Sequence, residues 1–163
     1  MPANPVDKKI QGLNILIVDS NHYMRRLTRT MLMNLGAKSV LEASDGLAAL
    51  ETIRTCDPDV MLLEWDMPVL DGMEVMRIVR SPGVFPRPAL PIIMLTTRGN
   101  RSAVAHALRA GAHEFLLKPT SPQALRDRLT SILSNPRPMV KLGDFYVPQP
   151  RRQPTNFDLQ QLG

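Results

Sequence analysis

The sequence predicts an α/β fold, a doubly wound five-stranded parallel sheet with helices on both faces. Three observations lead to this prediction. Short apolar runs alternate five times with amphipathic segments between residues 13 and 133. The apolar runs are strand-sized and nearly continuous, as a sheet covered on both faces requires. A Gly or Pro follows each amphipathic segment within a few residues, where a helix is expected to stop.

The predicted strands are the apolar runs of the alternation. The third has four apolar residues in a row, Val60 to Leu63, and the others are similarly short and bounded by polar residues. Runs of this length between turn signals fit buried strands better than helices. In chain order the predicted strands are Leu13–Val18, Ser39–Glu42, Asp59–Glu64, Pro91–Thr96 and Glu114–Leu117.

The predicted helices are the segments between and after these strands. In the first, Met24, Leu27 and Met31 recur at helical spacing. The last has Ser121 as its expected N-cap and Pro122 at its first position, both favoured at helix starts. In chain order the predicted helices are His22–Leu35, Gly46–Arg54, Gly72–Arg80, Arg101–Ala110 and Pro122–Leu133.

Composition narrows the classes of protein that the chain can represent. Its 163 residues are 44% hydrophobic, but no apolar run approaches the roughly 20 residues that span a bilayer. The polar start, Met1 to Gln11, does not resemble a secretory signal, and the single Cys56 rules out an internal disulfide. These features predict a cytoplasmic protein without a membrane span. The net charge of +5 is spread along the chain, so sequence-specific DNA binding is not expected.

The chain divides into three parts by composition. We expect an N-terminal extension over residues 1–11, one domain over residues 12–134, and an extended, Pro-rich tail over residues 135–163. The tail is too short for a second domain, and it lacks the apolar helical repeat that a helix-turn-helix module would need.

Chemically useful side chains stand where the predicted strands end. In parallel α/β sheets, the carboxyl ends of the strands carry the chemistry. Asp19 with Ser20, Glu64 with Asp66, Thr96 and Lys118 stand at these ends. Carboxylates attract a hard divalent cation, a hydroxyl donates a hydrogen bond, and an ammonium group neutralises an anion. Together they indicate a site of the phosphoryl-transfer type.

Five sequence motifs resemble the receiver domains of two-component response regulators, in matching order and spacing over residues 12 to 134. They are Ile15-Leu-Ile-Val-Asp19, Asp59-Val-Met-Leu-Leu-Glu-Trp-Asp-Met-Pro68, Asp71-Gly72, Pro91-Ile-Ile-Met-Leu-Thr96 and Phe115-Leu-Leu-Lys-Pro119. The resemblance is to chemotaxis-like, single-domain receivers. It implies a flavodoxin-like (βα)5 fold with strand order 2-1-3-4-5 and a signalling role without enzymatic activity.

The resemblance assigns a role to each residue of the acidic pocket. Glu64 stands where receivers carry the Asp that accepts a phosphoryl group. Asp19 matches the first of two metal-binding acids, but Ser20 replaces the second. Asp66 stands where the family uses a backbone carbonyl to bind the metal, and Lys118 matches the lysine that pairs with phosphate.

The resemblance also identifies a conformational switch and a partner surface. Thr96 matches the switch hydroxyl, and Phe115 matches the aromatic residue whose orientation reports the state of the site. Receivers usually meet histidine kinases, motor proteins or other signalling proteins through the face that corresponds here to Arg101–Ala110, Glu114–Leu117 and Pro122–Leu133. We therefore expect this face to bind the partner.

Two of the substitutions argue against ordinary phosphorylation. Glu extends its carboxylate roughly 1.5 Å further than Asp, and a 1 Å error can cost on the order of 100-fold in rate. Ser20 removes a charge from the metal site, so no cofactor is required and at most weak Mg²⁺ binding by Asp19, Glu64 and Asp66 is expected. Two hypotheses for Glu64 then remain. It is a built-in activator that imitates phosphate, or it is part of a site that has lost its function and is merely paired with Lys118.

The tail leaves several alternatives open. Arginine-containing tails on related alphaproteobacterial receivers capture cyclic di-GMP, and Arg137, Tyr146, Arg151 and Arg152 are the candidate ligands here. Alternatively, Phe145 and Tyr146 pin the tail onto the domain or a partner, or the tail has no role.

Three functional hypotheses follow from the sequence. The first is a phosphorylation-independent adaptor in a two-component or motility pathway. The second is a receiver still phosphorylated or metal-bound through a non-standard acid such as Asp66. The third is a cyclic di-GMP effector. A doubly wound nucleotide enzyme is disfavoured because no glycine-rich loop follows the first strand.

Overall fold

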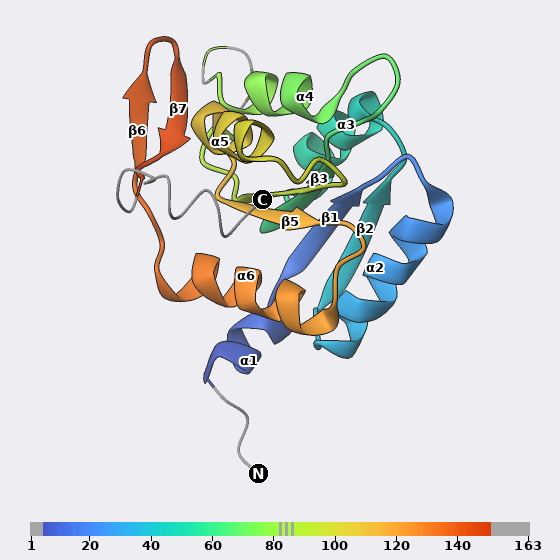
Figure 1. Ribbon diagram of the computed structural model, residues 1–163. Coiled ribbons are helices and arrows are strands. Elements are labelled where there is room, and N and C mark those ends of the chain that lie inside the picture. Colours follow the sequence, from blue (N-terminus) through green and yellow to red (C-terminus); the bar gives the residue numbers. More distant parts are fainter. Residues whose placement is uncertain (1–4, 82, 84, 86, 151–163) are drawn as a thin grey trace.

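The computed structural model describes residues 5–81, 83, 85 and 87–150. Five parallel strands form one sheet in the order β2-β1-β3-β4-β5, which confirms the predicted fold class and strand order (Figure 1). The strands are β1 Asn14–Val18, β2 Ser39–Ala43, β3 Val60–Glu64, β4 Ile92–Thr96 and β5 Glu114–Leu117.

Helices cover both faces of this sheet. The first face packs Leu32 of α2 and Leu129 of α6 against alternate strand residues such as Ile17. The second face packs Ile53 of α3, together with residues of α4 and α5, against the other set. These helices are α2 His22–Asn34, α3 Gly46–Cys56, α4 Gly72–Val79, α5 Arg101–Ala110 and α6 Pro122–Ser134. The three inner strands, β1, β3 and β4, are therefore buried on both sides, as their apolar sequences predicted.

A polar side chain fixes the first turn of each of these helices. In every case its oxygen accepts a hydrogen bond from the backbone N–H three residues further on, which satisfies one otherwise unpaired donor. The Asp71 cap of α4 is reciprocated by Glu74, which completes a capping box. The five N-caps are Asn21, Asp45, Asp71, Asn100 and Ser121.

The first turn of α4 approaches the end of β3 so closely that only glycine fits there. A Cβ atom on Gly72 would lie 2.2 Å from the carbonyl oxygen of Glu64. The amide of Gly72 donates to the carbonyl of Trp65 at 2.8 Å. The close packing of Gly72, which follows the N-cap Asp71, therefore holds the backbone of Glu64 in place against the start of α4.

Both flanking segments carry regular structure that was not expected from the sequence. Residues 5–11 form the helix α1, Pro5–Gln11, and Ile10 on it is buried in the same cluster as Leu129 of α6. After α6, the strands β6 Met139–Leu142 and β7 Phe145–Pro148 form an antiparallel hairpin. Part of the expected extended tail is thus folded. Within the described residues, no helix is long and apolar enough to cross a membrane.

Candidate functional site

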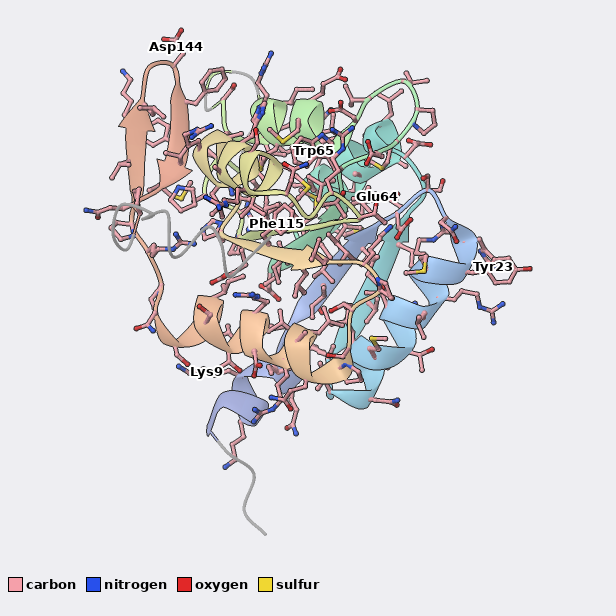
Figure 2. All side chains as sticks on the ribbon, viewed as in Figure 1. Lys9, Tyr23, Glu64, Trp65, Phe115 and Asp144 are labelled. Atoms are coloured by element: carbon pink, nitrogen blue, oxygen red, sulfur yellow. The ribbon has the colours of Figure 1, made fainter. Side chains whose placement is uncertain are left out.

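The ammonium group of Lys118 lies between two carboxylates at the carboxyl edge of the sheet. Its Nζ is 2.6 Å from Oδ2 of Asp19 and 2.9 Å from Oε1 of Glu64. All three side chains are largely withdrawn from solvent, with 6% of Lys118, 1% of Asp19 and 14% of Glu64 exposed. The three come from the ends of β1, β3 and β5, as the strand-end argument predicted. With all three groups ionised, the cluster would carry a net charge of −1 (Figure 2 labels Glu64).

The backbone and the side chain of Ser20 both donate hydrogen bonds to the second carboxylate oxygen of Glu64. Its backbone N–H donates to Oε2 at 2.9 Å, and its hydroxyl Oγ donates to the same atom at 3.0 Å. The neighbouring Asn21 amide donates to Oδ1 of Asp19 at 2.8 Å. Both oxygens of the Glu64 carboxylate are therefore engaged, one by Lys118 and the other by Ser20.

The two acids respond differently to this environment. Burial raises the pKa of Asp19 above its ordinary value, and contact with the Glu64 carboxyl adds to that rise while Lys118 opposes it. Burial alone would also raise the pKa of Glu64. There, however, hydrogen bonds with Lys118, Asp19 and Ser20 outweigh burial and hold the pKa below its ordinary value. Glu64 is therefore the carboxylate that stays charged most readily in the pocket.

The predicted switch pair, Thr96 and Phe115, is buried on adjacent strands. Thr96 ends β4 with 1% of its surface exposed, and its Oγ1 accepts from the amide of Arg98 at 3.2 Å. Phe115 is 5% exposed, lies opposite Met94 of β4, and packs in the core cluster that includes Val104 of α5 (Figure 2). The phenyl ring therefore points into the domain and not into solvent.

Asp66 does not join this cluster. Its carboxylate pairs with the guanidinium of Arg98, with Arg98 Nη2 to Asp66 Oδ1 at 2.6 Å and Arg98 Nε within 3.1 Å of both oxygens. Hydrogen bonding to Arg98 holds the pKa of Asp66 below its ordinary value. The same guanidinium lies 4.7 Å from the centre of the Trp65 ring. The rings of Trp65 and His106 of α5 pack edge to face, with their centres 5.8 Å apart. The loops after β3 and β4 are thus linked across the edge of the site.

Arg98 was not identified from the sequence, and Trp65, which lies within a strand end selected there, was given no role of its own. Trp65 follows Glu64 directly, and Arg98 stands two residues after Thr96, so both lie beside strand ends already identified as the site. Their position beside those strand ends was the one sequence feature that could have marked both residues as part of the site. The ion pair itself joins two loops separated by 32 residues, and residue spacing does not indicate such a pairing.

The residues present do not fit a divalent metal. Lys118 occupies the space between Asp19 and Glu64, Ser20 contributes a hydroxyl where the resemblance to receivers leads us to expect an acid, and Asp66 is paired with Arg98. In the described part of the chain, no three His, Cys, Asp or Glu side chains come together in a way that could hold a metal ion. In this structure positively charged side chains pair with Asp19, Glu64 and Asp66, and the weak Mg²⁺ site expected at these acids stays a prediction.

A shallow pocket of about 390 Å³ lies on the outer side of β5 and the start of α6. Most of its lining is apolar, and Leu117 at its margin has 40% of its surface exposed. Thr120 contributes an Oγ1 atom that is buried and without a hydrogen-bond partner in the structure. The lining residues are Phe115, Leu116, Leu117, Pro119, Thr120, Ser121, Ala124 and Arg128.

Of the four tail residues predicted to bind a ligand, the structure describes two, and both contact the domain. The guanidinium of Arg137 donates to the backbone carbonyl of His113. The backbone amide of Tyr146 donates to the carbonyl of Arg80 at 3.0 Å. Arg151 and Arg152 lie outside the described residues. The structure thus brings Arg137 and Tyr146 onto the domain and does not gather them into a ligand site.

Comparison with known proteins identifies the family of this fold and site. The family model for the response regulator receiver domain matches residues 15–130, which is more than two thirds of the chain. The chain belongs to the response regulator receiver family. Receiver domains are generally signalling modules without enzymatic activity, and receivers of this kind act by contact with other signalling proteins.

Individual relatives point to chemotaxis. The chain is 37% identical over 122 residues to the chemotaxis protein CheY1 of Helicobacter pylori, covering 74% of this chain and 97% of that protein. It is 35% identical to the CheY homolog of Campylobacter jejuni, over 74% of this chain and 92% of the relative. The chain is therefore similar to CheY-like receivers of two-component signalling over nearly their whole length.

Solved structures show the same likeness. A response regulator from Chloroflexus aurantiacus superposes with a TM-score of 0.69 at 33% identity, covering 76% of this chain and 98% of that one. Vibrio cholerae CheY4 superposes with a TM-score of 0.66 at 29% identity, covering 74% and 98%. The segments outside the match to the family model include α1 and the β6–β7 hairpin.

Proposed function

We propose that this receiver is a phosphorylation-independent, cytoplasmic signalling adaptor in a two-component or motility pathway. The observation that carries the proposal is the contact of the Glu64 carboxylate with Lys118 and Ser20. The resemblance to receivers assigns position 64 to the residue that accepts phosphate. A negative group bonded to that lysine is what phosphorylation would otherwise supply. This supports the reading of Glu64 as a built-in activator, with a permanent side chain in place of a transient modification.

The pocket disfavours phosphoryl transfer for electrostatic reasons. An incoming phosphoryl donor would meet the negative carboxylate of Glu64, and the lysine that would neutralise the donor is already paired with both Asp19 and Glu64. The family relies on a metal ion to offset that charge, and the residues here do not provide its site. Asp66, the alternative acceptor, is held by Arg98 on the exposed edge of the site.

The partner surface of the proposal is the face formed by α5, β5 and α6. The ring of Phe115 is buried in the core, and the pocket on the outer side of β5, which a ring turned outward would fill, is open. This inward position supports an active-like arrangement of the switch residues. Basic side chains occur on both helices of this face, and Arg128 lines the pocket; they are Arg101, Arg109, Arg126 and Arg128. A signalling protein with an acidic surface and an apolar anchor would complement them.

The proposal is tested by exposing the full chain to acetyl phosphate and Mg²⁺ and measuring the intact mass. No phosphoryl adduct is expected on the wild-type protein or on the Asp66→Asn variant. The double variant Ser20→Asp with Glu64→Asp restores both family acids and serves as the positive control. A stoichiometric, acid-labile adduct on wild-type protein would refute the proposal, and its loss in Asp66→Asn would place the acceptor at Asp66.

A further inference from the structure

The β6–β7 hairpin is joined to the end of the sheet opposite the Glu64 pocket. It stands beside α5 and the end of α4 (Figure 1), and its Val147 and Pro148 are buried. Figure 2 shows Asp144 at its tip, well away from Glu64. A two-stranded hairpin is marginal by itself in water, so its contacts with the domain are what hold it in place.

One edge of the hairpin is bonded to α4 and the other is not. Tyr146 and Lys141 face each other across the two strands. The N–H of Tyr146 points away from β6 and donates to the carbonyl of Arg80 at 3.0 Å. By the alternation of antiparallel pairing, the N–H of Lys141 points outward from the opposite edge. Among the described residues, that amide has no backbone partner on the domain.

Arg80, whose carbonyl accepts the hydrogen bond from the hairpin, lies in the interior of the domain. Arg80 is completely buried, and burial lowers its pKa to about 9. Its guanidinium donates to the carbonyl of Gly111 through Nη2 at 2.7 Å and to that of Pro88 through Nη1 at 2.7 Å. Nη2 also lies 3.2 Å from Nδ1 of His113. A Cβ atom on Gly111 would lie 2.9 Å from Nε of Arg80, so this packing requires the glycine.

A second bond from the tail reaches the same group of residues. Arg137, between α6 and the hairpin, donates to the backbone carbonyl of His113. The amide of His113 in turn donates to the carbonyl of Ile92 at the start of β4, at 2.8 Å. His113 directly precedes β5 and stands two residues before Phe115. Both arginine contacts therefore converge on the entry to the strand that carries the predicted switch residue.

We propose that residues 137–148, which comprise Arg137 and the hairpin, form a regulatory strap: their contacts with Arg80 and His113 hold the start of β5 and, through it, the buried position of Phe115. The inference rests on the proposed function, in which Phe115 sets the state of the partner face. With a fixed charge at position 64, the docked or released tail provides a variable input at the opposite end of the sheet. Release removes the Tyr146 and Arg137 contacts and loosens the first residues of β5.

The test compares Tyr146→Pro with Lys141→Pro in the full-length chain. Proline removes one outward-pointing N–H from the hairpin in each variant, but only the Tyr146 substitution removes the bond to Arg80. The readouts are hydrogen exchange of the His113 amide and the aromatic NMR signals of Phe115, assigned with a Phe115→Leu variant. We expect Tyr146→Pro to speed exchange at His113 by about 2- to 10-fold, the effect of one hydrogen bond, and to shift or broaden the Phe115 signals. Lys141→Pro should leave both readouts near wild type.

Equal responses in the two variants, or an unchanged Phe115 in both, would overturn the strap. If Tyr146→Pro does not fold, Arg137→Gln removes the second tether without altering the hairpin strands, and the same two readouts apply to it. The phosphodonor experiment is independent of these variants. A phosphorylated wild-type chain with a tail-sensitive Phe115 would refute the adaptor alone, and an unmodified chain with a tail-insensitive Phe115 would refute the strap alone.

Discussion

Replacing Lys118 with methionine should be among the most destabilising single changes in the pocket. At an effective dielectric constant of about 20, unit charges 2.6 to 2.9 Å apart attract each other by roughly 6 kcal/mol. The variant also recovers the cost of burying the ammonium group, so the net loss is smaller. Breaking a buried ion pair by removing one partner typically costs about 3–5 kcal/mol. We expect a loss of that size at pH 7, corresponding to a fall in Tm of roughly 6–20 °C.

The loss should depend on pH in a defined direction. Without Lys118, Asp19 and Glu64 face each other in the pocket, and their folded-state pKa values should rise above those of the unfolded chain. A carboxyl group with a raised folded-state pKa supports the fold at low pH and loses that contribution as the pH rises. The deficit of Lys118→Met should therefore be largest near pH 7 and shrink as the pH falls toward about 4.

Urea denaturation at several pH values measures this effect, because urea does not screen charges. Lys141→Met is the matched control, since Lys141 is exposed on the hairpin, and its cost should stay within about 0.5 kcal/mol. If Lys118→Met costs no more than that control at pH 7, or if its deficit grows on acidification, the buried cluster does not have the electrostatic structure described above.

Further predictions concern residues around the site and the strap. Thr120→Val should be neutral or stabilising by up to about 1 kcal/mol in thermal unfolding, since it removes a buried hydroxyl without a partner. Arg98→Ala should change stability by no more than about 1 kcal/mol, because its ion pair is half exposed, but it should alter the emission of Trp65, the single tryptophan. Gly111→Ala should lower Tm clearly, because the new methyl group meets Arg80 and the backbone φ of 122° disfavours alanine.

The sheet could be predicted because its signals are local. Each strand is an apolar run with a turn residue or helix cap after it, and five such units leave few topologies. The meeting of Asp19, Glu64 and Lys118 was also predictable, because the carboxyl ends of parallel strands share one edge. The strand-end pattern specifies which residues lie there, and the predicted ends agree with the observed ones to within about two residues.

What the sequence did not reveal depends on contacts between distant segments. Asp66 was expected near the acidic pocket, but Arg98 from another loop holds it at the edge. Residues 1–11 were expected to be a polar extension, yet Ile10 of α1 is buried in the core. The prolines of the tail obscured the hairpin, although Gly143-Asp144 between two short apolar runs is a recognisable two-residue hairpin loop.

The central claim is that Glu64 is a permanently charged partner of Lys118 in the pocket where receivers accept phosphate. Carbon-13 NMR of the Glu64 side-chain carboxyl, followed through a pH titration, tests it most directly. We expect the pKa of Glu64 to lie below the ordinary glutamate value in the wild-type chain and to rise clearly in the Lys118→Met variant. A Glu64 carboxyl that titrates at or above its ordinary value, with no response to the loss of Lys118, would contradict it.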